Sequence, residues 1–317
     1  MNTLSVGHHV SRHEAPESWM KPSHARSVIK LVIYAGSLVA LVWTLLIAEN
    51  ELIILGLQLS LGVVFAHGLE LQHECLHHNM FRSPSLNRLC GAMLGVPMLV
   101  SYTHYKIQHL HHHKFVGTPE DAEIFDYRAS QFTSLPGLIS RVWNLARIPM
   151  FLLTFIGILQ GRMPSAFEQE GRKRRHLRLE YWLIATLFVT ALIVTACANV
   201  HVFIRVWFIP WLLFAEVTHV LIELPEHIGC DRNVADPRWN TRSYATNCVW
   251  QYIANWNNYH VEHHCWPNLS TGHLREASEI LRATERHCAR SYWAAASAVI
   301  KSIRDSSRSE ARALLEP

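Results

Sequence analysis

The sequence predicts an all-α integral membrane protein, and two features of the chain lead to this fold class. The first is the distribution of apolar residues, which make up 50% of the 317 residues and gather in long segments. The second is a set of three histidine clusters in the more polar stretches between and after these segments. A membrane-spanning helix needs about 20 predominantly apolar residues, and four segments approach or meet this length: residues 28–48, 52–69, 181–200 and 202–222.

The four apolar segments form two pairs, because only short connections separate the members of each pair. Residues 49–51 join the first pair and residues 199–201 join the second. Each pair therefore predicts a helical hairpin whose two ends emerge on the same side of the membrane. Basic residues concentrate on that side, most densely at residues 171–178. The positive-inside rule then predicts that both termini are cytoplasmic.

Three regions are expected along the chain: a polar N-terminal tail (1–27), a membrane domain with the histidine clusters (28–272) and an amphipathic C-terminal tail (273–317). Charged and apolar residues alternate at helical spacing from 274 to 303, which predicts one amphipathic helix there. The N-terminal tail lacks the apolar core of a cleavable signal peptide. The seven cysteines show no paired spacing, which favours reduced thiols.

Two shorter apolar segments, residues 89–100 and 148–159, hold 12 residues each. This length is too short to cross a bilayer comfortably. We therefore expect both segments to be interfacial or re-entrant helices. A crossing by one of them would place the histidine clusters on opposite sides of the membrane.

The histidine clusters repeat a spacing that brings imidazoles to one side of a helix. Residues i, i+3 and i+4 are neighbours on a helix surface, and neutral imidazoles are common metal ligands. With 22 histidines in the chain, an HxxHH pattern is expected by chance only about 0.1 times, yet two occur. The clusters therefore predict a metal site built from His73 and His77, from His109, His112 and His113, and from His260, His263 and His264.

Eight histidines are more than one zinc ion requires, since zinc takes about four ligands. The number favours two metals, although imidazole suits iron, copper, zinc and nickel alike. The letters HECLH at 73–77 also match the HExxH signature of zinc proteases, with Glu74 as the general base. That alternative leaves the six histidines of the two HxxHH clusters without a role, and we keep it as a minor alternative.

The order of the clusters resembles the integral-membrane fatty acid desaturase and hydroxylase superfamily. The matching stretches are HECLHH, then HLHHH, then NNYHVEHHCWPNLS after two more predicted spans. The resemblance covers roughly residues 30–275. It implies a four-span helical protein with a cytoplasmic helical cap that holds two non-haem irons. It also implies an enzyme that uses dioxygen and external electrons to break an unactivated C–H bond.

Transferred to this sequence, the resemblance implies that the eight clustered histidines are the metal ligands, with no catalytic residue beyond them. A further ligand near the end of the fourth span is expected, with His227 as first choice and His219 as second. His78 is a weaker candidate, and His111 is expected to be dispensable. Supporting roles are expected for an amide oxygen of Asn257 or Asn258 and for the carboxylates of Glu74 and Glu262.

The expected reaction is desaturation of an acyl chain, and the clusters leave two alternatives open: hydroxylation, and desaturation of a small amino-acid-like metabolite such as dihydrorhizobitoxine. No haem-binding segment is fused to either end. Electrons are therefore expected from a separate ferredoxin-like or cytochrome-type protein and its reductase. Membrane lipid is an expected partner and nucleic acid is not. We expect a bacterial inner-membrane protein whose active site faces the cytoplasm.

Overall fold

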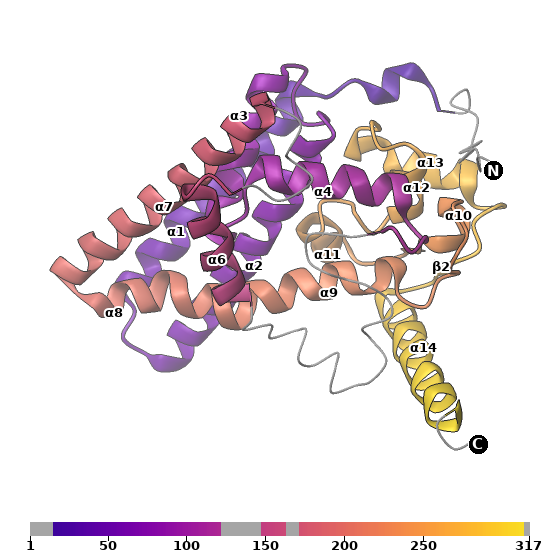
Figure 1. Cartoon of the computed structure of the whole chain (residues 1–317). Coiled ribbons are helices and arrows are strands. Elements are labelled where there is room, and N and C mark those ends of the chain that lie inside the picture. The colour runs from indigo at the N-terminus through magenta and orange to yellow at the C-terminus, as the bar shows by residue number, and fades with distance from the viewer. Residues whose placement is uncertain (1–14, 122–146, 163–170, 314–317) are drawn as a thin grey trace. The chain divides into compact units, whose positions relative to one another are not determined.

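The computed structural model describes residues 15–121, 147–162 and 171–313. Among these residues it is mostly helical (Figure 1) and holds four helical segments long and apolar enough to cross a membrane, which confirms the predicted fold class. Residues 1–14 of the expected N-terminal tail and 314–317 of the expected C-terminal tail lie outside the described residues. The chain divides into two compact units, one of residues 23–107 and 140–220, the other of residues 1–22, 108–139 and 221–317. Each unit is described by itself below.

The first hairpin consists of α1 (His24–Ile47) and α2 (Glu51–Leu76). Asn50 ends the connection and caps α2, because its side-chain oxygen accepts hydrogen bonds from the backbone N–H groups of Leu52 and Ile53. Helix α2 continues about two turns beyond the predicted segment. Every residue from Phe65 to Leu76 is buried, including the polar ones. The extension places the first histidine cluster on the same helix as the second predicted span.

The second hairpin begins with α7 (Gly171–Ala198), which turns at Asn199 into α8 (Val200–Phe203). Two π-helical stretches follow, Ile204–Phe208 and Pro210–Ala215, before α9 (Glu216–His227) completes the fourth span. A proline inside a helix removes one backbone donor and clashes with the preceding turn. Pro210 is the first residue of the second π-helical stretch, and prolines and π-helical turns are both common causes of irregularity in a helix.

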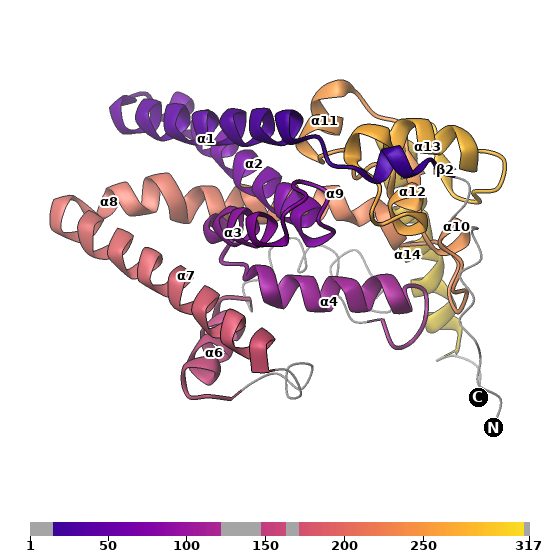
Figure 2. The same cartoon turned by 90° about the horizontal axis from the view of Figure 1, so that it is seen from above.

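The two shorter apolar segments form helices that do not reach spanning length. The first contains α3 (Pro84–Leu94), of 11 residues, followed by a 3₁₀ turn at Val96–Met98. The second is α6 (Arg147–Leu159), of 13 residues. Helix α2 packs against both α1 and α3, as Figures 1 and 2 show. The close contact between α2 and the fourth span occurs at Gly62, where a Cβ atom would collide with Phe214.

Helix α4 (Tyr102–Phe115) carries the second histidine cluster, and a buried carboxylate on α7 holds its start. Glu180 accepts hydrogen bonds from the Thr103 backbone N–H at 2.7 Å, the Thr103 hydroxyl at 2.6 Å and the Ser101 hydroxyl at 2.7 Å. A negative charge at a helix N-terminus is stabilised by the helix dipole. The next residue on α7, Tyr181, places its hydroxyl 2.8 Å from Nδ1 of His104.

The second unit is built from short elements around the third histidine cluster. They are a 3₁₀ turn (Glu17–Met20), α10 (Pro237–Asn240), β1 (Ser243–Tyr244), α11 (Cys248–Ile253), α12 (His260–Cys265), a 3₁₀ turn (Thr271–His273), α13 (Leu274–Leu281), β2 (Cys288–Ala289) and α14 (Tyr292–Ala313). Strands β1 and β2 pair in parallel. Helices α12 and α13 lie side by side (Figure 2) around a core that includes Val261, Leu269, Leu274 and Ala277.

The prediction of a single amphipathic helix from 274 to 303 is wrong. The structure forms two helices there, α13 and α14, separated by β2. Pairing with β1 requires an extended backbone, and the Ser243 and Ala245 N–H groups donate to the carbonyls of His287 and Ala289. Helix α14 has its own apolar contacts, because Val299 and Ile303 pack in a cluster with residues of α9 and the segment after it.

Candidate metal centre

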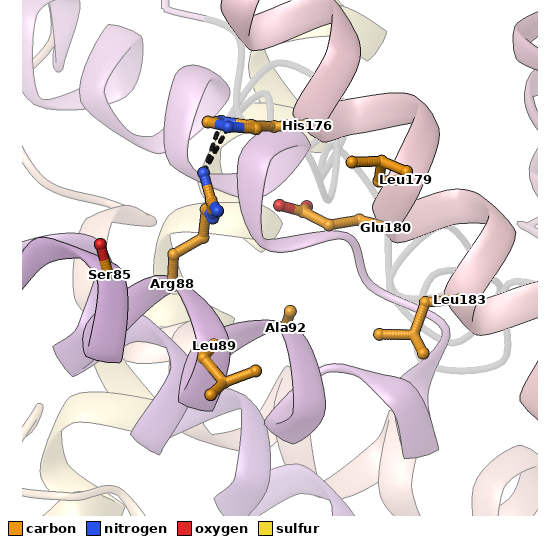
Figure 3. Close-up of a pocket in the computed structure, with 8 residues that line it drawn as sticks. All are labelled: Ser85, Arg88, Leu89, Ala92, His176, Leu179, Glu180 and Leu183. Carbon is orange, nitrogen blue, oxygen red and sulfur yellow. Dashed lines mark hydrogen bonds between the residues drawn. The ribbon is translucent and has the colours of Figure 1, made fainter.

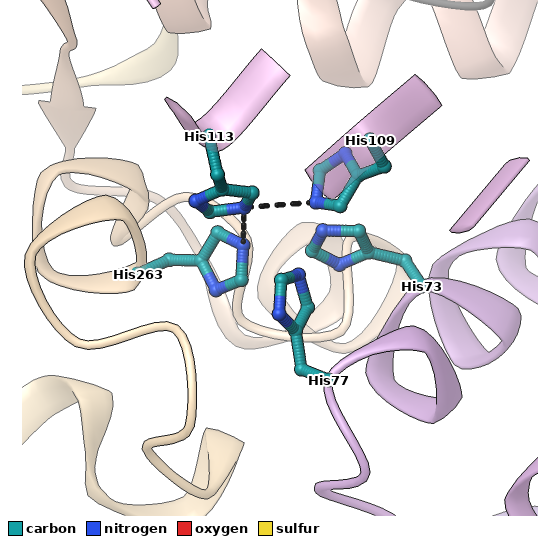
Figure 4. A group of neighbouring side chains, drawn as sticks. All are labelled: His73, His77, His109, His113 and His263. Atoms are coloured by element: carbon teal, nitrogen blue, oxygen red, sulfur yellow. Dashed lines mark hydrogen bonds between the residues drawn. The ribbon is translucent and has the colours of Figure 1, made fainter. Parts of the chain in front are cut away.

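Seven histidines of the second unit form two neighbouring groups, and each group takes residues from both α4 and α12. The first group joins His109 and His113 of α4 to His263 of α12, with Nε2 of His113 lying 2.9 Å from Nε2 of His109 and 3.1 Å from Nε2 of His263. Figure 4 shows these three rings with their nitrogens directed toward one another. The side chains of His109 and His263 are buried, and that of His113 is half-buried.

The second group joins His112 of α4, His227 at the end of α9, and His260 and His264 of α12. Nε2 of His227 lies 3.2 Å from Nε2 of His112 and 3.0 Å from Nε2 of His260. Nε2 of His264 lies 3.2 Å from Nε2 of His260. The two groups touch where the His113 and His264 rings stack with their centroids 4.2 Å apart.

These nitrogen separations suit metal ligation. Two nitrogens bound about 2.1 Å from one metal, at the angles of octahedral or tetrahedral coordination, lie roughly 3.0–3.4 Å apart. Burial and the neighbouring imidazoles lower the pKa of His264 well below its ordinary value, so its ring is neutral and its lone pair is available. The residues present therefore fit one metal ion at each group.

The far side of the second group's rings is held by oxygen acceptors. Nδ1 of His112 lies 2.9 Å from Asp121 Oδ1, and Nδ1 of His227 lies 3.2 Å from the Asn240 carbonyl. Nδ1 of His260 lies 3.1 Å from Asn257 Oδ1. An acceptor at Nδ1 keeps the proton on that nitrogen and directs the Nε2 lone pair toward the metal, as outer partners of metal-bound imidazoles usually do.

A carboxylate that the sequence argument did not select lies near Nε2 of His260, on the side of the ring that faces the group. Glu226 is buried, receives a hydrogen bond of 2.9 Å from the Asn257 amide, and places its other oxygen 3.3 Å from Nε2 of His260. The sequence could have indicated this residue, because Glu226 directly precedes the candidate ligand His227 in the stretch ELPEH. Asp121 was also overlooked, although it lies in the acidic stretch that follows the second cluster.

Local backbone structure positions the third cluster. The Ser243 hydroxyl accepts a hydrogen bond from the Val261 backbone N–H in the first turn of α12 and donates one of 2.6 Å to Glu262. Just before this helix, Asn255 and Trp256 have positive φ values of 46° and 65°. A bulky residue with positive φ is an uncommon, strained conformation that surrounding contacts must maintain. It marks the tight turn that directs the chain into the cluster.

The first cluster lies on α2, in the other unit. His73 and His77 are buried, and their ring centroids are 5.2 Å apart, as expected for positions i and i+4. Figure 4 draws both side chains on this helix. His78 has a positive φ of 58° and points its Nε2 at the Lys106 ammonium 2.7 Å away. Burial and Lys106 together lower the pKa of His78.

Several other candidates have different surroundings. His111 is exposed and its Nε2 lies 2.8 Å from the Glu120 carbonyl, so it belongs to neither group. His219 is fully buried in α9, lies 3.5 Å from Glu70 and is a member of neither group among the described residues. Asn258 donates to the Tyr244 carbonyl and is a structural residue.

The two carboxylates expected to orient imidazoles have other partners. Glu74 forms a buried ion pair of 2.8 Å with Lys30. Glu262 accepts its short hydrogen bond from Ser243, and burial raises its pKa to about 7. Asp121, Asn257 and a backbone carbonyl instead orient the imidazoles of the second group.

Comparison with known proteins gives a consistent result. Residues 51–296 match the fatty acid desaturase family. The chain is 23% identical over 233 residues to the sn-1 oleoyl-lipid 12-desaturase of Synechocystis sp., covering 70% of this chain and 66% of the relative. It is 22% identical over 219 residues to dihydrorhizobitoxine desaturase of Bradyrhizobium elkanii, covering 66% and 62%.

A shorter match, 29% identical over 105 residues, links the chain to the ferredoxin-type sn-1 acyl-lipid omega-3 desaturase of Nostoc sp., covering 33% of this chain and 28% of the relative. The chain spans less than two thirds of the length of each of these relatives. The family match extends over most of the chain and includes all three histidine clusters, and it favours an oxidoreductase over the protease alternative. With four candidate spans and histidine groups suited to two metals, the chain belongs to the fatty acid desaturase family and is an integral membrane protein.

Proposed function

We propose that this protein is a membrane desaturase that uses two histidine-bound irons to introduce a double bond into an acyl chain. The observation that supports this most strongly is the pair of histidine groups, in which Nε2 atoms of α4, α9 and α12 converge at 2.9–3.2 Å. Bound iron supplies the activation of dioxygen. The overall reaction consumes the saturated chain, dioxygen, two electrons and two protons, and yields the alkene and two waters.

His73 and His77 are proposed as two further iron ligands, as their spacing in the sequence predicts. The support is chemical: three histidines are few for an iron that must be held by neutral nitrogen, and α2 offers two more at ligand spacing. His227 is proposed as the fourth histidine of the second site. Asp121, Asn257 and Glu226 are proposed to hold the rings and to limit their motion.

The substrate is tested by comparing cells that contain the protein with cells that contain an inactive variant. We expect a new double bond in acyl chains of membrane lipids, detected by mass spectrometry of the hydrolysed chains. The variant His113→Ala is the matched inactive control, because its ring lies at the centre of the first group. Hydroxylated chains in place of unsaturated ones would replace desaturase by hydroxylase in the proposal.

A second candidate substrate is a small amino-acid-like metabolite. The identity to dihydrorhizobitoxine desaturase, 22%, is close to the identity to the lipid 12-desaturase, 23%. Unchanged lipids together with a newly unsaturated polar metabolite in the same extracts would favour this candidate. Electrons are proposed to come from a ferredoxin-like protein, as the name of the Nostoc relative suggests.

The orientation in the membrane is also a proposal, with the basic residues 172–175 on the cytoplasmic side. Cys197 is exposed close to the turn of the second hairpin, and Cys288 is exposed beside β1. In variants that keep only one of these cysteines, we expect a membrane-impermeant maleimide to label Cys197 from outside intact cells. Cys288 should react only in inside-out vesicles, and labelling of Cys288 in intact cells would reverse the proposed orientation.

A further inference from the structure

A cavity of about 240 Å³ lies between α3 and α7 in the first unit. Its lining has a polar end and an apolar end: Arg88 and Ser85 of α3 and His176 of α7 form the polar end, while leucines and Ala92 form the rest (Figure 3). Cavities that hold drug-sized ligands start at about 300 Å³. This one therefore has room for a charged head group and the chain segment attached to it, and not for a whole lipid.

The polar end carries the positive charge of Arg88, which interacts electrostatically with the Glu180 carboxyl in the same lining but forms no ion pair with it. Nη1 of Arg88 lies 2.8 Å from Nδ1 of the His176 imidazole, and no ion pair joins Arg88 to an acidic side chain in the described part of the chain. Glu180 also lines the cavity, but its oxygens accept three hydrogen bonds from Ser101 and Thr103 at the start of α4. The Glu180 oxygens are therefore engaged with the start of α4, while the Arg88 guanidinium contacts the His176 ring.

The sequence of α7 adds to this positive charge. Residues 172–175 read RKRR and lie at the beginning of a 28-residue helix that has no acidic residue in its first turn. Basic residues at a helix N-terminus oppose the helix dipole. Such a start is favourable where an anion is bound nearby, and clusters of basic residues beside a membrane span attract anionic lipid head groups.

The apolar end identifies the kind of anion. Leu89 and Leu179 are 60% and 56% exposed, and Leu183 lies one helical turn beyond Leu179, so this end of the cavity is apolar and open at the protein surface. A small inorganic anion would gain nothing from these leucines. A lipid phosphate would contact Arg88 while its glycerol and first methylenes lie against the leucines.

We propose that this cavity is a binding site for an anionic phospholipid, with the phosphate hydrogen-bonded to Arg88 and to the Ser85 hydroxyl. The acyl chains leave the cavity past Leu89 and Leu179 into the bilayer. Charge-assisted and bidentate arginine–phosphate contacts are among the stronger hydrogen bonds in proteins. The proposal does not depend on the reaction, so its test is a binding measurement that stands apart from the test of desaturation.

The test uses the full-length protein in phosphatidylcholine nanodiscs, titrated with dioctanoyl phosphatidylglycerol and followed by native mass spectrometry. We expect one phosphatidylglycerol to bind tightly, and we expect Arg88→Gln to weaken this binding about tenfold, as the loss of one charge-assisted hydrogen bond implies. Arg178→Gln is the matched control, because Arg178 is an exposed arginine on α7, the other helix beside the cavity, and does not line the cavity. Its affinity should stay within about twofold of the wild-type value.

A second variant keeps every charge in place. Ala92→Leu fills the cavity from α3 and should also weaken binding, even if Arg88→Gln fails to fold. Equal binding by wild type and both cavity variants would overturn the proposal, as would equal weakening by Arg178→Gln, which would indicate only a general attraction of basic residues. Millimolar inorganic phosphate should not displace the lipid, and displacement would reassign the site to free phosphate.

Discussion

Replacing His264 by alanine is expected to remove one of two irons and to lower the rate of substrate oxidation at least about 100-fold, beyond the range typical of outer-shell partners. His264 is buried, is neutral and contacts the rings of His112, His227 and His260. Its loss leaves the second group with three histidines and opens a space beside His113 of the first group. Iron content by elemental analysis and product formation with a reduced ferredoxin measure both effects.

His111→Ala is the matched control for this prediction, because His111 is on the same helix as the second cluster and belongs to neither group. It should keep two irons and near wild-type activity. A His264→Ala protein with full iron content and full activity would show that this residue is not a ligand. An iron-poor His111→Ala protein would show that the assignment of α4 residues to the groups is wrong.

Replacing Glu226 by alanine is expected to lower the oxidation rate about 10–100-fold, the usual effect of losing a partner that supports metal ligands. The carboxylate contacts both the Asn257 amide and Nε2 of His260. Its removal frees Asn257 to turn away from Nδ1 of His260, so the ring loses its fixed orientation. Iron content and turnover should fall together, and Glu226→Gln should retain more iron than Glu226→Ala because its amide oxygen can still accept from Asn257.

Glu279→Ala is a suitable comparison, since Glu279 is exposed on α13 and contacts no histidine of the groups. If Glu226→Ala and Glu279→Ala both matched the wild-type protein in iron content and rate, Glu226 would have no role at the metals.

Much of the fold followed from the sequence because bilayer thickness fixes the length of a spanning helix. The four apolar segments could therefore be recognised in the sequence, and so could the short connection before α2, which ends at the helix cap Asn50. The break between α13 and α14 was not visible. The periodicity from 274 to 303 is helical throughout, but pairing of β2 with β1, far away in sequence, overrides it.

The sequence by itself determined the class of site, since two HxxHH patterns and one HxxxH pattern specify metal ligands at helical spacing.

Only the tertiary structure decided how the ligands divide between the two groups. In α4, His109 and His113 belong to the first group and His112 to the second, whereas in α12 His263 belongs to the first and His260 and His264 to the second. Positions i+3 and i+4 lie about 100° apart around a helix, so the three histidines on one side of a helix can divide between two sites, as both clusters do here. Which of them face which site depends on how α4, α9 and α12 pack, and that same packing brought Glu226 and Asp121 to the second group.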